Sequence, residues 1–295
     1  MAANTAPTQP DSGIVAQSRV PYEAFLWYGA LLTLSFWSVV NAMVYQWQND
    51  DDMSHGMFVP LIAGYAFWEL REKWLSLPQA RNPWGLVVIA WGAVQLWVAT
   101  LGSELFLQRT AILVTLVGLI LFYGGGAGLR LLRFPLFLLL FMVPIPGVFQ
   151  KQITFPLQLL ASRIGELVIE VFGYMVYREG NVLELAGQQL SVAEACSGIR
   201  SLFSLAFFGL TYAYLFDTRV WTRWYLLAAS VPVALAVNAL RIVVTAVVGE
   251  HNPELAQGVY HTASGWTLFV AGIVFMIGLW KLTTLRWWRR EVSHV

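Results

Sequence analysis

The chain has 295 residues, of which 58% are hydrophobic and only 12% are charged, with a mean hydropathy of +0.61 and a net charge of +1 at pH 7. An average soluble domain carries about a quarter charged residues, so this composition excludes an ordinary soluble globular protein. The single cysteine excludes an internal disulfide, and neither a metal-ligand spacing nor a basic stripe is present. We therefore expect no metal or other cofactor and no nucleic-acid partner.

Apolar blocks divide the chain, and most of them are long enough to cross about 30 Å of hydrocarbon as a helix. The blocks lack the alternation of an outer-membrane barrel, and backbone groups in lipid must otherwise be bonded within a helix. We therefore predict an all-α, polytopic transmembrane helical bundle of about eight spans. The predicted spans are residues 24–45, 57–70, 84–101, 110–125, 133–143, 199–216, 224–248 and 265–282.

The predicted organisation places residues 1–22 in a disordered cytoplasmic N-terminus, residues 23–283 in the transmembrane catalytic bundle and residues 284–295 in a basic cytoplasmic tail. The first span is expected to stay uncleaved, because it is longer than a signal peptide and ends in acidic residues. Lysine and arginine gather in alternate loops, which places both termini in the cytoplasm by the positive-inside rule. The expected location is an inner (plasma) membrane.

One connection, residues 144–198, is longer than the others and lies on the predicted outer side. Residues 148–177 have apolar side chains at helical spacing with polar ones between them, which predicts an amphipathic helix lying on the membrane or against the bundle. Residues 182–192 alternate and are split by Gly187, which is compatible with a small hairpin. The alternative is that both elements form a lid without chemistry.

Arg241 lies inside the seventh predicted span, about 10 Å below the outer surface at about 1.5 Å per residue. An arginine at this depth costs about 2.5 to 3.5 kcal/mol on insertion scales, so it is expected to be paired or to line a wet cavity. Asn238 and Thr245 share its helical face. We interpret Arg241 as a partner for an anion or oxyanion. The alternative is an arginine that caps a neighbouring helix or extends to the interface.

Cys196 lies where a polar outer segment meets the start of the sixth predicted span. Unpaired N–H groups and the helix dipole favour a thiolate at such a position, and Arg200, one turn further on, would add to this effect. Gly198 would let a substrate backbone approach closely, and the N–H groups from Ser197 onward could form an oxyanion hole. The alternative is a small apolar filler, as most lone cysteines in membrane bundles are.

Two histidines are candidate bases for such a thiol. His261 lies just before the eighth predicted span, where a neutral imidazole could accept a thiol proton and later protonate a leaving amine. A histidine that merely caps a helix is the alternative at this position. His55, at the outer start of the second predicted span, is a rival base that the predicted topology does not exclude.

Cys196, Arg241 and His261 fall at one predicted depth on consecutive helices, and short connections keep such helices adjacent. A thiol, a buried cation and an imidazole at one level suit acyl transfer. The sequence therefore predicts that these three side chains meet near the outer face of the membrane.

These residues resemble those of the exosortase/archaeosortase family of polytopic membrane cysteine enzymes. The resemblance covers roughly residues 25–280 and is carried by Ala-Cys-Ser-Gly-Ile-Arg-Ser at 195–201, by Asn-Ala-Leu-Arg-Ile at 238–242 and by His261 with the Ser-Gly pair at 264–265. The Ser-His-Gly segment around His55 is also similar to the family. Archaeal members carry arginine where this chain has His261, so the pattern is closer to the bacterial exosortases.

The resemblance implies a membrane cysteine protease or transpeptidase that sorts proteins, by analogy with soluble sortases. Its substrates would be exported proteins with a C-terminal tail made of a Pro-Glu-Pro-like motif, a membrane helix and a basic cluster. It implies that Cys196 is the nucleophile, Arg241 stabilises the oxyanion or orients the substrate, and His261 is the acid and base.

By this resemblance, a thioester on Cys196 would be resolved by water or by an acceptor such as a cell-surface glycoconjugate. Both transpeptidation and hydrolysis are compatible with the residues. The alternative functions are a polysaccharide-export component or transporter with a structural cysteine, and a non-catalytic assembly factor for surface polysaccharide.

Overall fold

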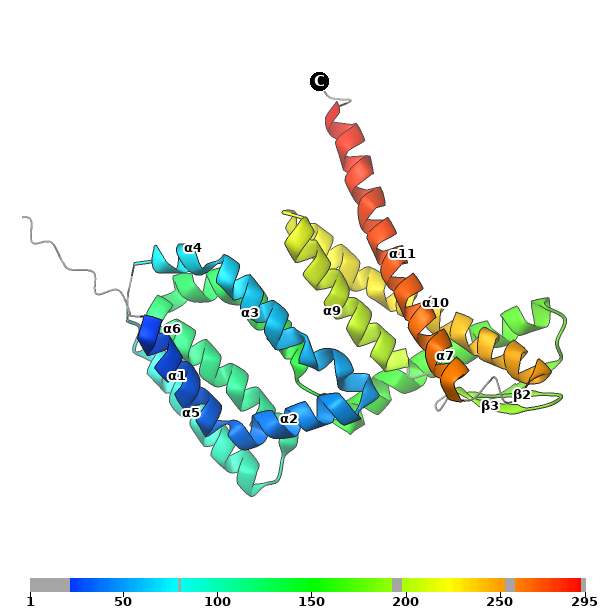
Figure 1. The fold of residues 1–295 in the computed structure, drawn as a ribbon, viewed down its shortest axis with the longest axis horizontal. Coiled ribbons are helices and arrows are strands. Elements are labelled where there is room, and N and C mark those ends of the chain that lie inside the picture. The colour runs from blue at the N-terminus through cyan, green and yellow to red at the C-terminus, as the bar shows by residue number, and fades with distance from the viewer. Residues whose placement is uncertain (1–21, 79–80, 193–197, 253–257, 293–295) are drawn as a thin grey trace, which may run out of the picture.

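The computed structural model describes residues 22–78, 81–192, 198–252 and 258–292, which form a helical protein with one small sheet (Figure 1). Within these residues, four helical stretches are long and apolar enough to cross a membrane. They are Trp84–Leu101, Leu105–Met142, Val220–His251 and Ala263–Leu285. A helical membrane protein is therefore confirmed, whereas the predicted number of about eight spans is not.

The first group of helices, which we call the N-terminal half, covers residues 22–142. Its elements are α1 (Tyr22–Ser35), α2 (Trp37–Asn49), the 3₁₀ segment η1 (Asp51–Met57), α3 (Val59–Glu69), α4 (Arg71–Leu75), α5 (Trp84–Leu101), α6 (Leu105–Leu138) and the 3₁₀ segment η2 (Leu139–Met142). The first predicted span thus consists of two helices, which are separated at Phe36. The fourth and fifth predicted spans both belong to α6 and η2.

Helix α6 changes direction at Gly125, whose backbone angles (φ 58°, ψ −157°) lie in a region that favours glycine. Both sides of the bend contact the ring of Trp74, because a Cβ atom on Gly124 or Gly128 would lie 2.5 Å or 2.7 Å from it. The bend explains why two apolar blocks, which were predicted as separate spans, form a single interrupted helix.

Helices α5 and α6 pack through small residues that allow their backbones to approach closely. A Cβ atom on Gly118 of α6 would lie 2.8 Å from the backbone nitrogen of Ile89 in α5. In the other direction, a Cβ atom on Gly92 of α5 would lie 2.5 Å from the hydroxyl of Thr115 in α6. These contacts make α5 and the first arm of α6 a tightly packed pair.

The second group, which we call the C-terminal half, covers residues 147–292 and lies beside the first (Figure 1). Its elements are α7 (Gly147–Val171), β1 (Val176–Glu179), β2 (Val182–Leu185), β3 (Gln189–Ser191), α9 (Gly198–Phe216), α10 (Val220–His251) and α11 (Gly258–Val292). The strands form an antiparallel sheet in the order β1-β2-β3. We call the end of this half that carries the sheet, the start of α9 and the end of α10 the sheet end.

The predicted amphipathic helix is present as α7, although it ends at Val171 rather than near residue 177. Gly173, with φ 86°, turns the chain into β1. The predicted hairpin is present as β2 and β3, and β1 is an additional strand. One buried cluster, which includes Ile169, Leu183 and Ile242, attaches α7 and the sheet to α10.

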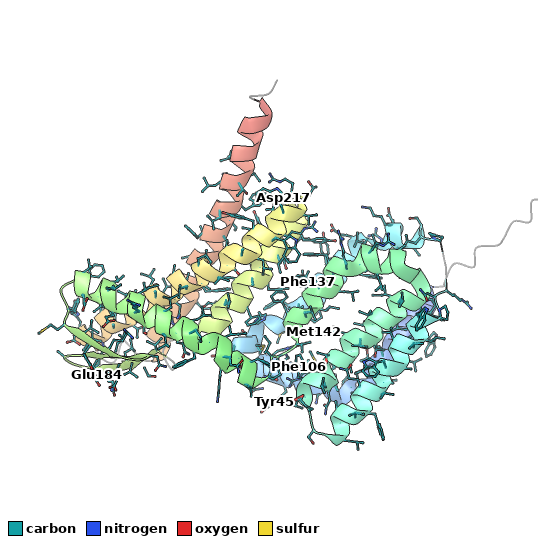
Figure 2. The ribbon with its side chains drawn as sticks, turned by 180° about the vertical axis from the view of Figure 1, so that it is seen from behind. Tyr45, Phe106, Phe137, Met142, Glu184 and Asp217 are labelled. Carbon is teal, nitrogen blue, oxygen red and sulfur yellow. The ribbon has the colours of Figure 1, made fainter. Side chains whose placement is uncertain are left out.

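The two halves share a buried apolar cluster in which Phe207 and Leu210 of α9 pack with residues of α2, α3 and α6. Met142 belongs to this cluster, and Figure 2 shows it where the two groups of helices meet. The indole N–H of Trp47 donates a hydrogen bond to the carbonyl oxygen of Met142 at 3.0 Å. This bond joins α2 to η2, and the shared cluster packs both of them against α9.

Candidate active site

The predicted site residues that the structure describes lie in η1, at the start of α9, in α10 and at the start of α11. Cys196 and Ser197 lie outside the described residues, which resume at Gly198. His261 lies within α11, of which only the backbone is described at this position. Arg200, Asn238 and Arg241 are described with their side chains. Two of these three described side chains, those of Asn238 and Arg241, lie on α10.

Arg241 is half-buried in α10, ten residues before that helix ends at His251. This corresponds to about 15 Å along the axis from the helix end, which is further than expected because α10 continues past residue 248. The guanidinium lies directly against α11, since a Cβ atom on Gly265 would be only 3.1 Å from both Cζ and Nη2 of Arg241. Glycine at this position therefore makes room for the guanidinium.

The same face of α11 carries the backbone of His261. Residues four apart lie one turn from each other on the same side of a helix, and His261 precedes Gly265 by four residues. The start of α11 thus presents positions 261 and 265 towards one side, and the second of these positions contacts Arg241.

Two further polar residues of α10 are buried on the face that carries Arg241. Asn238 and Thr245 are each only 5% exposed, and they lie three residues before and four residues after Arg241. On the adjacent face, Ile242 packs against α7, where a Cβ atom on Gly165 would lie 2.9 Å from its Cγ2. The predicted polar stripe of α10 is therefore present beside an apolar contact that anchors the helix.

The sheet holds the chain that leads towards Cys196 against the end of α10. The side-chain amide of Gln188 donates to the carbonyl oxygen of Ala246 at 2.6 Å, and the N–H of Gly187 donates to Oε2 of Glu250 at 3.2 Å. After β3, the fully buried Val192 donates its N–H to the carbonyl oxygen of Asn181 at 2.9 Å. The chain is thus fixed on one side of residue 196.

On the other side, the start of α9 is fixed by Arg200. Its Nη2 lies 3.1 Å from the carboxylate of Asp51, and its Nε lies 3.4 Å from the carboxylate of Asp52. Covalent geometry alone keeps the Cα atom of Cys196 within about 8 Å of that of Gly198. The sequence predicted that the charge of Arg200 acts on the thiol. Its two carboxylate partners were not predicted, although the acidic run at residues 50–52 is visible in the sequence.

His55, the rival base, is 7% exposed and lies in η1. Its ring stacks on Phe203 with 6.3 Å between centroids and 9° between planes, and Phe207 lies 6.4 Å away. Burial lowers the pKa of His55 below 6.5, although the carbonyls of Phe141 and Asp52 and the charge of Asp52 act in the opposite direction. Phe203 lies about 7 Å along α9 from Gly198, so the imidazole contacts the second turn of α9.

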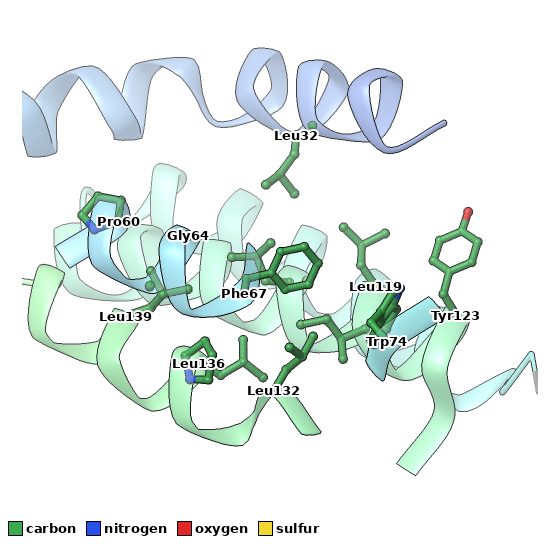
Figure 3. Close-up of a pocket in the computed structure, with 15 residues that line it drawn as sticks. Leu32, Pro60, Gly64, Phe67, Trp74, Leu119, Tyr123, Leu132, Leu136 and Leu139 are labelled. Carbon is green, nitrogen blue, oxygen red and sulfur yellow. The ribbon is translucent and has the colours of Figure 1, made fainter. Parts of the chain in front are cut away.

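An apolar pocket of about 350 Å³ lies in the N-terminal half, between α1, α3 and the two arms of α6 (Figure 3). Leu32, Phe67 and Leu132 are among the residues that line it. Its lining contains no acidic or basic side chain and none of the predicted site residues. This pocket therefore offers nothing to the predicted chemistry.

A second apolar cleft of about 670 Å³ runs between α10 and α11. Leu240 and Leu268 both line it. Leu240 directly precedes Arg241, and Leu268 lies three residues after Gly265, so one part of the cleft adjoins the Arg241–Gly265 contact.

Among the described residues, no group of three or more His, Cys, Asp or Glu side chains could hold a metal ion.

Comparisons with known proteins identify the family of the chain. No curated protein and no solved structure matches the chain. A family model described as transmembrane exosortase matches residues 47–278, which include η1, the sheet, the start of α9 and the contact between α10 and α11. Because this match covers most of the chain, the protein belongs to the transmembrane exosortase family.

Proposed function

We propose that the protein is a membrane cysteine transpeptidase or protease that cleaves the C-terminal sorting tails of exported proteins. Membership of the transmembrane exosortase family supports this activity. The observation that carries the proposal is the contact between the Arg241 guanidinium and Gly265. A charge inside a spanning helix is costly, and here it is placed beside the α11 face that also carries His261.

In the proposed reaction, the Cys196 thiolate attacks a backbone carbonyl of the substrate tail. Arg241 stabilises the negative charge that develops on the carbonyl oxygen, as donors placed at developing charge do. The imidazolium of His261 gives its proton to the leaving nitrogen as the C–N bond breaks. An acyl group then remains on the sulfur as a thioester, with the tail released.

An acceptor nucleophile resolves the thioester in the second step. The oxygen or nitrogen of the acceptor attacks the thioester carbonyl, and His261, which is now neutral, takes the proton that the acceptor loses. The C–S bond breaks and the Cys196 thiolate is restored. A cell-surface glycoconjugate fits the role of acceptor, and water in its place gives hydrolysis.

We propose His261 rather than His55 as the base of this reaction. The imidazole of His55 is buried against Phe203, one turn and more inside the start of α9. Position 261 instead lies one turn from Gly265, which contacts Arg241. An imidazole at position 261 can therefore exchange a proton with the thiol of Cys196, which precedes Gly198 in the chain.

We also propose that the site faces the outer side of a bacterial inner membrane, with both chain termini in the cytoplasm. The distribution of lysine and arginine among the loops supports this orientation. A substrate tail with a membrane helix would present its cleavable carbonyl near this face. The apolar cleft that adjoins Arg241 gives such a helix a surface beside the site.

The test is an exported reporter protein that ends in a Pro-Glu-Pro-type tail, expressed with the full-length protein. We expect wild type to shorten the reporter, and Cys196→Ser and Cys196→Ala to abolish the shortening. A covalent adduct between reporter and enzyme should form in wild type only and should be released by hydroxylamine. Gly278→Ala is the matched control, because a Cβ atom there meets nothing within 4 Å.

Processing by Cys196→Ser at the wild-type rate would contradict the proposal. That result would favour the alternative of an export component or transporter, in which the cysteine is structural and Arg241 binds an anionic substrate.

A further inference from the structure

The acidic segment at the start of η1 forms a charged cluster with the first turn of α9. Arg200 contacts Asp51 at 3.1 Å and Asp52 at 3.4 Å, but the two carboxylates differ in exposure. The side chain of Asp51 is 81% exposed and that of Asp52 only 22%. Water and salt screen exposed pairs strongly, so Asp52 is the partner whose charge matters more.

Asp52 also connects η1 to a third element. The side-chain amide of Gln150 in α7 donates to Oδ2 of Asp52 at 3.4 Å. The backbone N–H of Asp52 donates to the side chain of Asp50 at 3.0 Å, which caps the start of η1. A single carboxylate therefore contacts the helix start that follows Cys196 and the helix that precedes the sheet.

The segment η1 is itself fixed on its other side. A Cβ atom on Gly56 would lie 2.5 Å from Nε1 of Trp47, so the backbone of η1 rests directly on the indole ring. That indole is bonded to the carbonyl oxygen of Met142 at 3.0 Å. These contacts hold η1 in place, so a bond from η1 to α9 can determine the position of the first turn of α9.

We propose that Asp52 is a positioning residue of this site, which ties the first turn of α9 to η1 and α7 through Arg200 and Gln150. This inference rests on the proposed function, because it concerns where Cys196 is delivered. Arg200 follows Cys196 by four residues, so its ion pair sets the direction in which the chain enters α9. The same pair neutralises a cation that would otherwise act on the thiol.

A double-mutant cycle on the full-length protein in membranes tests this role. Cys196 is the only cysteine in the chain, so N-ethylmaleimide labels a single site, and the rate of labelling can be followed against pH. The variants are Asp52→Asn, Arg200→Gln and the combination of both. Processing of the tailed reporter is measured in parallel.

The two charges should move the labelling profile in opposite directions. In Asp52→Asn, the cation of Arg200 loses its more buried partner and stabilises the thiolate, so half-maximal labelling should occur at lower pH. In Arg200→Gln, the carboxylates of Asp51 and Asp52 both lose their cation, and half-maximal labelling should occur at higher pH. The double variant should label like wild type. A purely structural defect would not produce this pattern.

Processing of the reporter should depend on the position of Cys196 rather than on the local net charge. A displacement of about 1 Å at a reacting group can cost about 100-fold in rate, so we expect a 10- to 100-fold loss in all three variants, including the double. Asp51→Asn is the matched control, because it removes the exposed carboxylate of the same arginine, and it should change processing by less than about twofold.

A labelling profile that Asp52→Asn leaves unchanged, or full processing by the double variant, would overturn the inference. If a variant is poorly folded, the charge exchange Asp52→Arg with Arg200→Asp provides a second test, in which recovery of processing supports the proposal. The labelling cycle needs no substrate. Failure of wild type to process the reporter would therefore remove the proposed function while leaving the effect of Asp52 on Cys196 measurable.

Discussion

The N-terminal and C-terminal halves are both apolar helical groups, but they are held together by different contacts. In the N-terminal half, α5 and α6 meet through glycines, and Trp74 fills the bend of α6. In the C-terminal half, α10 carries a buried polar stripe, and a small sheet is hydrogen-bonded to its end. One half is packed for stability, and the other keeps polar groups that lipid alone would not tolerate.

This difference indicates where function lies in a membrane protein. Buried polar residues in spanning segments are costly, so those that persist mark sites or paired structural contacts. Arg109, which is 7% exposed near the start of α6, is a buried charge of the N-terminal half that the proposed site does not use. The C-terminal half instead gathers Asn238, Arg241 and Thr245 on one helix face.

The largest expected effect comes from removing the charge of α10. Arg241→Gln should reduce reporter processing by about 100- to 1,000-fold, because the loss of one oxyanion donor costs about that much. The melting temperature should change little, since the amide of glutamine can still form hydrogen bonds at this position. Arg241→Lys, which keeps the charge without the planar fork, should recover part of the activity.

A drop in both stability and processing with Arg241→Gln would break the contrast between the halves. Arg241 would then act as a structural arginine, like the glycine and tryptophan contacts of the N-terminal half. Melting of the purified variant in detergent, measured beside reporter processing, separates these two results.

The next effect belongs to the N-terminal half. Gly118→Val forces side-chain atoms into the backbone of α5, where a Cβ atom alone would lie 2.8 Å from the backbone nitrogen of Ile89. Overpacking of this kind costs about 1 to 3 kcal/mol, so the melting temperature should fall. Processing per folded molecule should stay at the wild-type level.

The matched control for this substitution is Gly126→Ala in the same helix, where a Cβ atom meets nothing within 4 Å. It should leave stability unchanged or raise it slightly, because alanine favours helix. A Gly118→Val protein that is stable but inactive would show that the packing of α5 and α6 reaches the site.

A polar contact of the C-terminal half that lies away from the site gives the third effect. Asp217, at the end of α9 opposite the sheet end, is 8% exposed and accepts hydrogen bonds from Arg219 at 2.7 Å and from the indole of Trp280 at 3.1 Å. Burial alone would raise its pKa, but these bonds lower it from 3.8 to about 2. This shift corresponds to about 2 kcal/mol of stability.

Because the folded pKa of Asp217 is depressed, this stabilisation is present above about pH 4 and is lost as pH falls towards 2. Asp217→Asn should therefore lower stability at pH 7 and flatten the loss of stability below pH 4, with processing unchanged. Denaturation of both proteins across this pH range is the measurement. If Asp217→Asn lost processing without losing stability, the end of α9 that carries Asp217 would contribute to the reaction, contrary to this prediction.

Apolar patterning was sufficient to predict the helical class and several helices. The predicted span 84–101 coincides with α5, because Pro83 and Gly102 mark its ends. The bend of α6 was not predictable, since the run of three glycines at residues 124–126 does not show which one turns the chain, and the Trp74 ring that packs against both sides of the bend comes from another helix. Strand β1 was absorbed into the preceding helical pattern, because four residues carry too little periodicity.

For the site, the sequence supplied residue types and an approximate depth but no contacts. The mid-helix arginine was visible as an anomaly, whereas the glycine that accommodates it lies on another helix. The carboxylates bound to Arg200 lie about 150 residues earlier in the chain, and no local pattern connects them. Whether Cys196 and His261 complete the site remains a prediction, which the experiments with Cys196 variants address.

The smallest expected effect concerns His55, which lies in η1 of the N-terminal half but contacts α9 of the other. Burial lowers its pKa below 6.5, so the folded protein favours the neutral ring more than the unfolded chain does. The stability that depends on the neutral ring is present above about pH 6.5 and is lost as pH falls below it. The melting temperature should therefore fall between pH 8 and pH 5.5. His55→Phe keeps a ring to stack on Phe203 and should remove this pH dependence while processing continues. If His55→Phe instead kept its stability and lost processing, the imidazole would act in the reaction, and η1 would belong with the C-terminal half as part of the site.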